Sequence, residues 1–201
     1  ASQGFFKNCT FLEVDNTGYM VGTFENTIFI ADNENIEVLS YKQTGNPDMC
    51  NKQYSDFFDG NTNLLLNSVN DVTTIIIRYP GINKYSNPMI INKAVNITGT
   101  FDATWNGDIT FVSGSEGSNL TDMTLNGTVY INTTNIGLYN NTVNKGVVIK
   151  DSADNIIVDN TFNTEDVAIT LVNTIQTNIQ NNDITSQAEY AIALDDDSIT
   201  S

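Results

Sequence analysis

A short apolar motif recurs along the chain at a nearly fixed interval. Each copy is an apolar residue, any residue and a second apolar residue. The copies occupy residues 89–91, 109–111, 129–131, 147–149, 167–169 and 192–194. Their first residues lie 20, 20, 18, 20 and 25 positions apart (109−89, 129−109, 147−129, 167−147, 192−167). A recurrence of this length indicates a solenoid, in which one coil buries its apolar face only against its neighbours.

A second, Asn-rich motif lies between these copies. It occupies residues 119–126, 135–144, 155–163 and 178–184. Both motifs alternate apolar and polar residues, which is typical of strands, and the intervening Asn, Thr, Asp and Gly are typical of corners. The sequence therefore predicts an all-β fold, a right-handed parallel β-helix, over residues 73–201. We expect this helix to continue beyond Ser201, because residues 195–201 begin another coil.

Residues 1–72 do not repeat cleanly. They contain short strand-like segments, and the periodicity fails between Asp15 and Asn70. Residues 54–58 fit a short helical turn capped by Ser55 or Asp56, and residues 64–66 fit either a helix or a strand. We expect this irregular N-terminal segment to be a cap or an insertion.

Stacking of equivalent residues predicts three apolar columns inside the coil. The first column would contain Ile75 and Ile77 together with the outer residues of the six recurring motifs. The second would contain Val95, Ile97, Ile136, Leu138, Ile156 and Val158. The third would contain Met123, Leu125, Val143, Phe162 and Ile184. At the corners we expect asparagine side chains to form amide ladders.

The charge balance excludes several partners. The chain has 24 acidic and eight basic residues, a formal net charge of −16, and no histidine. Nucleic acids and anionic membrane surfaces bind clustered Lys and Arg, so neither partner is expected. The commonest general base and metal ligand is missing. No apolar run of membrane-spanning length is present, so we expect no direct membrane insertion in this segment. We also expect no cofactor.

One stretch resembles a known class of surface protein. The resemblance is to the adhesin-like right-handed β-helix proteins of methanogenic archaea. It is carried by residues 74–81, Asn87 to Lys93 and residues 95–99, together with corners such as Asn160-Thr161-Phe162. The resemblance covers roughly residues 73–201 and concerns fold and composition. It implies an extracellular location, at the cell surface or in the cell wall. It also implies an adhesive or spacer role, with a cell-wall polymer, a glycan, another surface protein or a second copy as partner.

A polysaccharide-active enzyme is the main alternative function, and a virus or phage fibre is the second. Resemblance to lyases with this fold would imply a cluster of calcium-binding acidic residues beside a basic residue that acts as the base. The grouping nearest to such a site is Lys145 and Lys150 with Asp151 and Asp154. Glycoside hydrolases need two carboxylates at a defined separation, such as Asp159 with Asp183. With so many acidic residues such pairs arise by chance, so we expect a non-catalytic protein.

Three aromatic residues and one acidic run are candidates for binding. Trp105, Tyr130 and Tyr139 could stack on sugars, or simply cover the wall of the coil. Residues 195–197 are three aspartates, but strand alternation would split them between two faces. We therefore expect weak calcium binding there at most.

Two kinds of covalent modification follow from the extracellular interpretation. Cys9 and Cys50 are the only cysteines, so they are either two separate thiols or one disulfide, and an extracellular protein favours the disulfide. Asn-x-Ser/Thr acceptors for N-glycosylation occur at Asn8, Asn96, Asn119, Asn126, Asn132 and Asn140.

The middle residues of the recurring motif predict an outward stripe. The stripe would contain Ile90, Thr110, Tyr130, Val148, Ala168 and Ala193. It is unusually apolar for a solvated wall, and contiguous apolar surface often marks a contact site. We expect either a partner or part of residues 15–70 to cover it.

Overall fold

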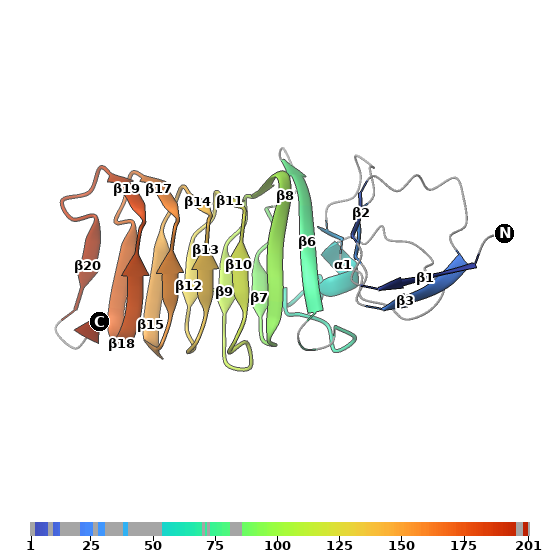
Figure 1. Cartoon of the computed structure of the whole chain (residues 1–201). Helices are drawn as coiled ribbons and strands as arrows, with labels where there is room; N and C mark the ends of the chain where they lie inside the picture. The colour runs from blue at the N-terminus through green and yellow to red at the C-terminus, as the bar shows by residue number, and fades with distance from the viewer. Residues whose placement is uncertain are drawn as a thin grey trace.

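The computed structural model describes residues 3–7, 10–12, 21–25, 28–30, 38–39, 54–69, 71, 73–80, 86–195 and 199–200. The predicted all-β parallel β-helix is confirmed. Short parallel strands stack into a solenoid of about five turns, with successive coils side by side along one axis (Figure 1). The helix α1 (Tyr54–Phe57) is the one α-helix of the described chain.

Each coil contributes one short strand to each of three walls. The first wall is formed by β7 (Met89–Ile91), β9 (Ile109–Phe111), β12 (Val129–Ile131), β15 (Val147–Ala153), the start of β18 (Ile169–Gln180) and β20 (Ile192–Leu194). The second wall is formed by β6 (Thr73–Pro80), the start of β8 (Val95–Trp105), β10 (Asn119–Thr121), β13 (Gly137–Tyr139), β16 (Ile156–Val158) and the end of β18. The third wall is formed by the end of β8, β11 (Thr124–Leu125), β14 (Thr142–Val143), β17 (Thr161–Thr164) and β19 (Asp183–Ser186).

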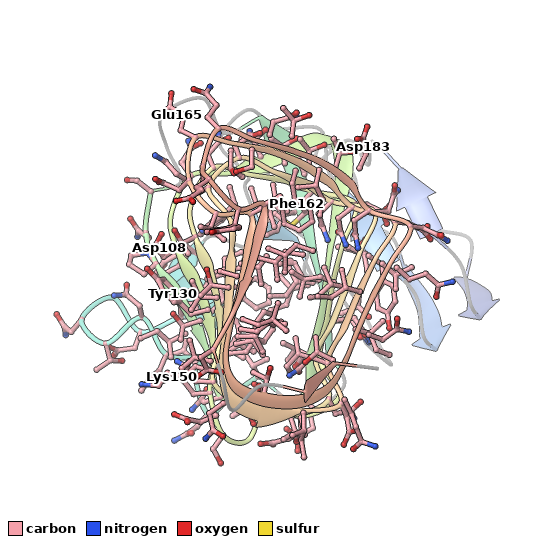
Figure 2. All side chains as sticks on the ribbon, turned by 90° about the vertical axis from the view of Figure 1, so that its left-hand side faces the viewer. Asp108, Tyr130, Lys150, Phe162, Glu165 and Asp183 are labelled. Atoms are coloured by element: carbon pink, nitrogen blue, oxygen red, sulfur yellow. The ribbon has the colours of Figure 1, made fainter. Side chains whose placement is uncertain are left out.

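The first wall has the predicted register except at one coil. Met89, Ile109, Val129 and Val147 are in register, and all are buried. The next partner of Val147 is Ile169 and not the predicted Val167, so this step spans 22 residues (169−147). The link between the third and first walls is longer in this coil, with Glu165 and Asp166 exposed on the outside (Figure 2). The inward pair is therefore Ile169 with Leu171.

The second wall differs more from the prediction. Its inward column is Ile75, Ile97, Leu120, Leu138, Ile157 and Ile179. Ile75 and Ile77 therefore belong here and not to the first wall. Ile156 and Val158 were predicted to point inward, but Ile157 is the fully buried residue of that strand. The reason is Asn155, whose side chain takes the inward position before Ile156 and accepts a hydrogen bond from the Ile136 backbone N–H at 3.0 Å.

The third wall has the predicted column with one addition and one loss. Met123, predicted to belong to it, lies one residue before β11 at the position that Asn141 takes in the next coil, and its backbone N–H donates to the Asn141 Oδ1 at 3.1 Å. Leu125, Val143, Phe162 and Ile184 are in register, as predicted, and Trp105 extends the column by one coil. Trp105, Val143 and Phe162 have no exposed surface, and Phe162 lies inside the coil in the end-on view (Figure 2). The bulky indole fills the width of the coil at this level.

A buried asparagine ladder holds the corner between the second and third walls. The Asn141 amide donates to the Asn160 Oδ1 at 3.0 Å, and the Asn160 amide donates to the Asn182 Oδ1 at 3.1 Å. The same amides also donate to backbone carbonyls, for example Asn160 to Leu138 at 3.0 Å. The ladder confirms the prediction of amide ladders at the corners. At this corner, the residue before the inward side chain has a positive φ in four successive coils, a conformation that Asn and Asp tolerate. These residues are Asp122, Asn140, Asp159 and Asn181.

Residues 54–69 pack against the first coil. Phe58 and Leu65 are buried, Leu64 bridges Ile90 of β7, and the Lys93 ammonium donates to the Leu66 and Val69 carbonyls at 2.9 Å each. The short helical turn expected here is confirmed as α1, but Ser55 and Asp56 lie within it, so the prediction that one of them caps its start is wrong. The Tyr54 ring stacks on Phe58 and on Trp105 at 4.8 and 6.1 Å between centroids. These contacts cover the apolar interior at this end of the coil stack.

Six further strands complete the described part of the chain. β1 (Gln3–Lys7) pairs with β3 (Val21–Glu25) and β2 (Thr10–Leu12) with β4 (Ile28–Ile30), both in parallel. β5 (Val38–Leu39) pairs antiparallel with β6, and β21 (Ile199–Thr200) pairs with β18. The turn expected at residues 45–48 lies outside the described residues.

Substituting Ile149 by Asp tests the packing of the first wall. Ile149 has no exposed surface and lies between Ile131 and Leu171. An unpaired carboxylate there should lower the free energy of unfolding by more than about 4 kcal/mol. Lys150→Ala, one residue further and exposed, should change it by less than about 0.5 kcal/mol. Denaturant unfolding measures both variants, and equal losses would contradict this packing.

A pH titration tests the contact of Tyr54 with the first coil. The Tyr54 hydroxyl donates to the Pro88 carbonyl at 2.5 Å, and burial, followed by the negative charge of Asp59, raises the pKa of Tyr54 to about 12. Its contribution to stability is therefore present below the ordinary tyrosine pKa of about 10 and is lost as the pH rises through 12. Tyr54→Phe should be less stable at neutral pH and should lose less stability between these values. Tyr190→Phe, at an exposed position, should follow the wild type.

Candidate contact surfaces

The charged residues considered for catalysis do not converge. The Lys150 ammonium lies 3.9 Å from the Asp151 carboxylate, but more than half of each side chain is exposed. Asp151 and Asp154 both have positive φ and form corners. Asp159 is also at a corner, and Asp183 is in register with Thr161 of the neighbouring coil; both carboxylates are exposed.

Two acidic side chains brace loops. Asp59 accepts hydrogen bonds from the Thr62 backbone, the Thr62 hydroxyl and the Asn61 backbone at 2.7, 2.9 and 3.0 Å, which lower the pKa of Asp59. Glu116 accepts a hydrogen bond from the Thr133 hydroxyl, which lowers its pKa, and another from the Gly114 N–H at 2.9 Å. The hydrogen bonds of Asp59 are local, and the bond from Thr133 to Glu116 joins two neighbouring coils, so both explain loop shape and do not assemble a reaction centre.

The described residues contain no group of three acidic, histidine or cysteine side chains arranged for a metal ion. Asp195 uses both carboxylate oxygens to accept the Asn173 backbone N–H, at 2.9 and 3.1 Å. Asp196 and Asp197 lie outside the described residues. Weak calcium binding at this run stays a prediction.

The three aromatic candidates have different positions. Trp105 is fully buried and its indole N–H donates to the Asn87 carbonyl at 3.1 Å, so the prediction of a sugar-stacking surface residue is wrong for Trp105. Tyr130 and Tyr139 are partly exposed, but Tyr130 faces outward from the first wall and Tyr139 from the second. The structure therefore does not bring the three rings to one surface.

The predicted outward stripe exists with one substitution in its membership. Ala168 is fully buried, because the first-wall strand of this coil begins two residues later than predicted, and Thr170 takes its place in register. The side chains of the six residues that form the observed stripe are all partly exposed. We call this surface the first-wall stripe, and it consists of Ile90, Thr110, Tyr130, Val148, Thr170 and Ala193.

The glycosylation acceptors differ in how their amides are held. The Asn119 amide donates to the Asn96 Oδ1 at 2.9 Å, and the Asn140 amide donates to Asp122 at 2.6 Å. Asn126 both donates to Asn106 and accepts from Asn144, at 2.7 Å each. Asn132 is exposed at the end of β12. Asn8, Cys9 and Cys50 lie outside the described residues, so the glycosylation at Asn8 and the disulfide stay predictions.

A second ordered surface, on the third wall, escaped sequence reasoning. The wall turns Thr104, Thr124, Thr142 and Thr161 outward in one in-register rank. Two residues after each threonine is an asparagine, which forms a second rank: Asn106, Asn126, Asn144 and Asn163. We call the two ranks the threonine–asparagine face. The signal was present as Thr-x-Asn recurring after 20, 18 and 19 residues (124−104, 142−124, 161−142).

Comparison with protein-family models, with curated proteins and with solved structures finds no match for the chain. Among the described helices, none has the length and apolar character needed to cross a lipid bilayer. The surfaces described above are therefore the basis for a functional proposal.

Alanine substitution tests how the glycosylation acceptors are held. Asn126→Ala removes both hydrogen bonds of the amide ladder on the third wall and should cost about 1–3 kcal/mol of unfolding free energy. Asn132→Ala, at an exposed position, should cost less than about 0.5 kcal/mol. Thermal or denaturant unfolding measures both. A larger loss at Asn132 than at Asn126 would contradict the ladder.

Proposed function

We propose that this chain is a non-catalytic module of the cell surface, an adhesin-like or spacer protein that contacts a partner through the first-wall stripe. The observation that carries the proposal is the register of the stripe. Ile90, Tyr130, Val148 and Ala193 lie in one line on consecutive or near-consecutive coils and keep part of their surface exposed.

The body beneath the stripe suits a contact surface. Except at Ala193, the residues on either side of each stripe residue are buried, as Val147 and Ile149 are on either side of Val148. The outward side chains are therefore held in place before a partner arrives, which reduces the entropy lost on binding. Because the surface is flat and extends along the axis, it fits an extended partner or a second flat surface.

Two further observations support a binding role over a catalytic one. A reaction centre needs polar groups that converge in a sheltered site. The basic and acidic residues described above are instead distributed over exposed corners and strand ends, with Lys150 and Asp151 as an exposed pair. The resemblance to adhesin-like β-helix proteins of methanogenic archaea supports an extracellular location and a cell-wall polymer, glycan or surface protein as partner.

Substituting Val148 by Lys tests the stripe. Val148 lies between Tyr130 and Thr170, so a lysine there would place a charge in the middle of the contact. The affinity for the partner should fall about tenfold or more, which corresponds to about 1.4 kcal/mol. The measurement is sedimentation of the purified chain for self-association, and pull-down with insoluble cell-wall polymer and with immobilised surface protein.

Thr142→Lys is the matched control, because it adds the same charge to another wall of the same coil. It should leave this binding unchanged. Equal binding by the wild type and Val148→Lys would contradict the proposal. Turnover of an acidic polysaccharide by the purified chain would overturn it in favour of an enzyme.

A further inference from the structure

The threonine–asparagine face is regular in two directions. Along the axis, the in-register pairs Thr104–Thr124, Thr124–Thr142 and Thr142–Thr161 repeat at the strand spacing of ~4.7–4.9 Å. Across the axis, the threonine and the asparagine of one coil are two residues apart, which corresponds to about 6.6 Å in extended backbone; Asn106, Asn126 and Asn144 directly follow their strands, and Asn163 lies within β17. Four consecutive coils present the same pair of side-chain types.

The face is also rigid. Between its two ranks, each strand turns one bulky residue inward, and these residues are fully or almost fully buried: Trp105, Leu125, Val143 and Phe162. Three of the four asparagines are tied together by hydrogen bonds of 2.7 Å from Asn144 to Asn126 and from Asn126 to Asn106. Threonine is restricted at χ1 by its branched β-carbon. The spacing of the outward groups is therefore set by the backbone.

The chemistry of the face is uniform and uncharged. Hydroxyls, methyl groups and amides alternate, and the first acidic residue in the threonine rank is Asp183, in the coil after Thr161. The aromatic residues of these strands, Trp105 and Phe162, are buried inside and present no ring for a sugar to stack on. A rank of identical groups at a constant spacing complements a partner that repeats at the same spacing, which is a property of crystals.

Ice is such a partner. Its oxygen atoms repeat along one crystal axis at a spacing close to that between neighbouring β-strands. Its surface offers hydrogen-bond donors and acceptors and carries no charge, as the two ranks do. Threonine methyl groups add apolar area that favours an ordered water layer next to the hydroxyls and amides. We propose that the threonine–asparagine face binds the surface of ice.

The test uses the purified whole chain in two assays. The first measures the gap between the melting and freezing temperatures of a single ice crystal in the protein solution. The second measures how much fluorescently labelled protein enters a growing ice hemisphere. The wild type should open a measurable gap and enter the ice. Thr142→Lys, in the middle of the face, should abolish both effects, because the longer charged side chain lifts the face from the lattice.

Three variants make the result decisive. Thr161→Lys, at an exposed position, repeats the test where lysine is readily accommodated, and circular dichroism verifies that both variants are folded. Val148→Lys should keep full ice activity, because it alters only the first-wall stripe. A loss of partner binding in this variant therefore tests the proposed function and leaves the ice-binding proposal untouched. No gap in the wild type, or an equal gap in both face variants, would overturn the proposal. Binding to powdered chitin or cellulose without a gap would overturn it in favour of a crystalline polysaccharide.

Discussion

The in-register stacking of parallel strands is the constraint on which the rest of the structure depends. Because each side chain lies directly above its equivalent in the previous coil, every position must suit a neighbour of similar chemistry. Apolar side chains then form columns, as Val129, Val147 and Ile169 do on the first wall. Outward side chains form ranks by the same rule. The third wall shows this most clearly, with threonine at the same outward position in four coils.

The same constraint makes it possible to bury amides. An isolated buried amide is costly because its donors and acceptor lose water. In this chain Asn160 accepts from Asn141, donates to Asn182 and also donates to the Leu138 carbonyl. Each asparagine thus satisfies its neighbours and is satisfied by them. Stacked asparagines at equivalent positions of successive coils therefore allow this fold to bury amides at its corners.

How far the sequence predicts the structure depends on whether a position follows the simple alternation. Most of the first and third columns was predictable, because apolar residues recur there at similar intervals, but Ile75 and Ile77 were assigned to the first wall and lie in the second. Ile156 and Val158 were assigned inward incorrectly, since Asn155 takes an inward position that an apolar pattern cannot identify. Val167 was predicted to point inward and Ala168 outward, and both predictions were wrong because a longer link displaces the strand of that coil to Ile169. The threonine–asparagine face was missed because outward residues carry no hydrophobic signal. The packing of Tyr54 on Trp105 joins residues 51 positions apart (105−54), which no local pattern reveals.

The contacts made by Tyr54, Phe58 and Leu65 on the first coil have a consequence for how the body responds to heat or force. In a solenoid each coil contacts only its neighbours, so opening resembles the unzipping of a one-dimensional chain. At the first coil the interior is covered, and Phe58 and Leu65 are almost fully buried. Opening of the first coil therefore first requires the contacts of Tyr54, Phe58 and Leu65 to break.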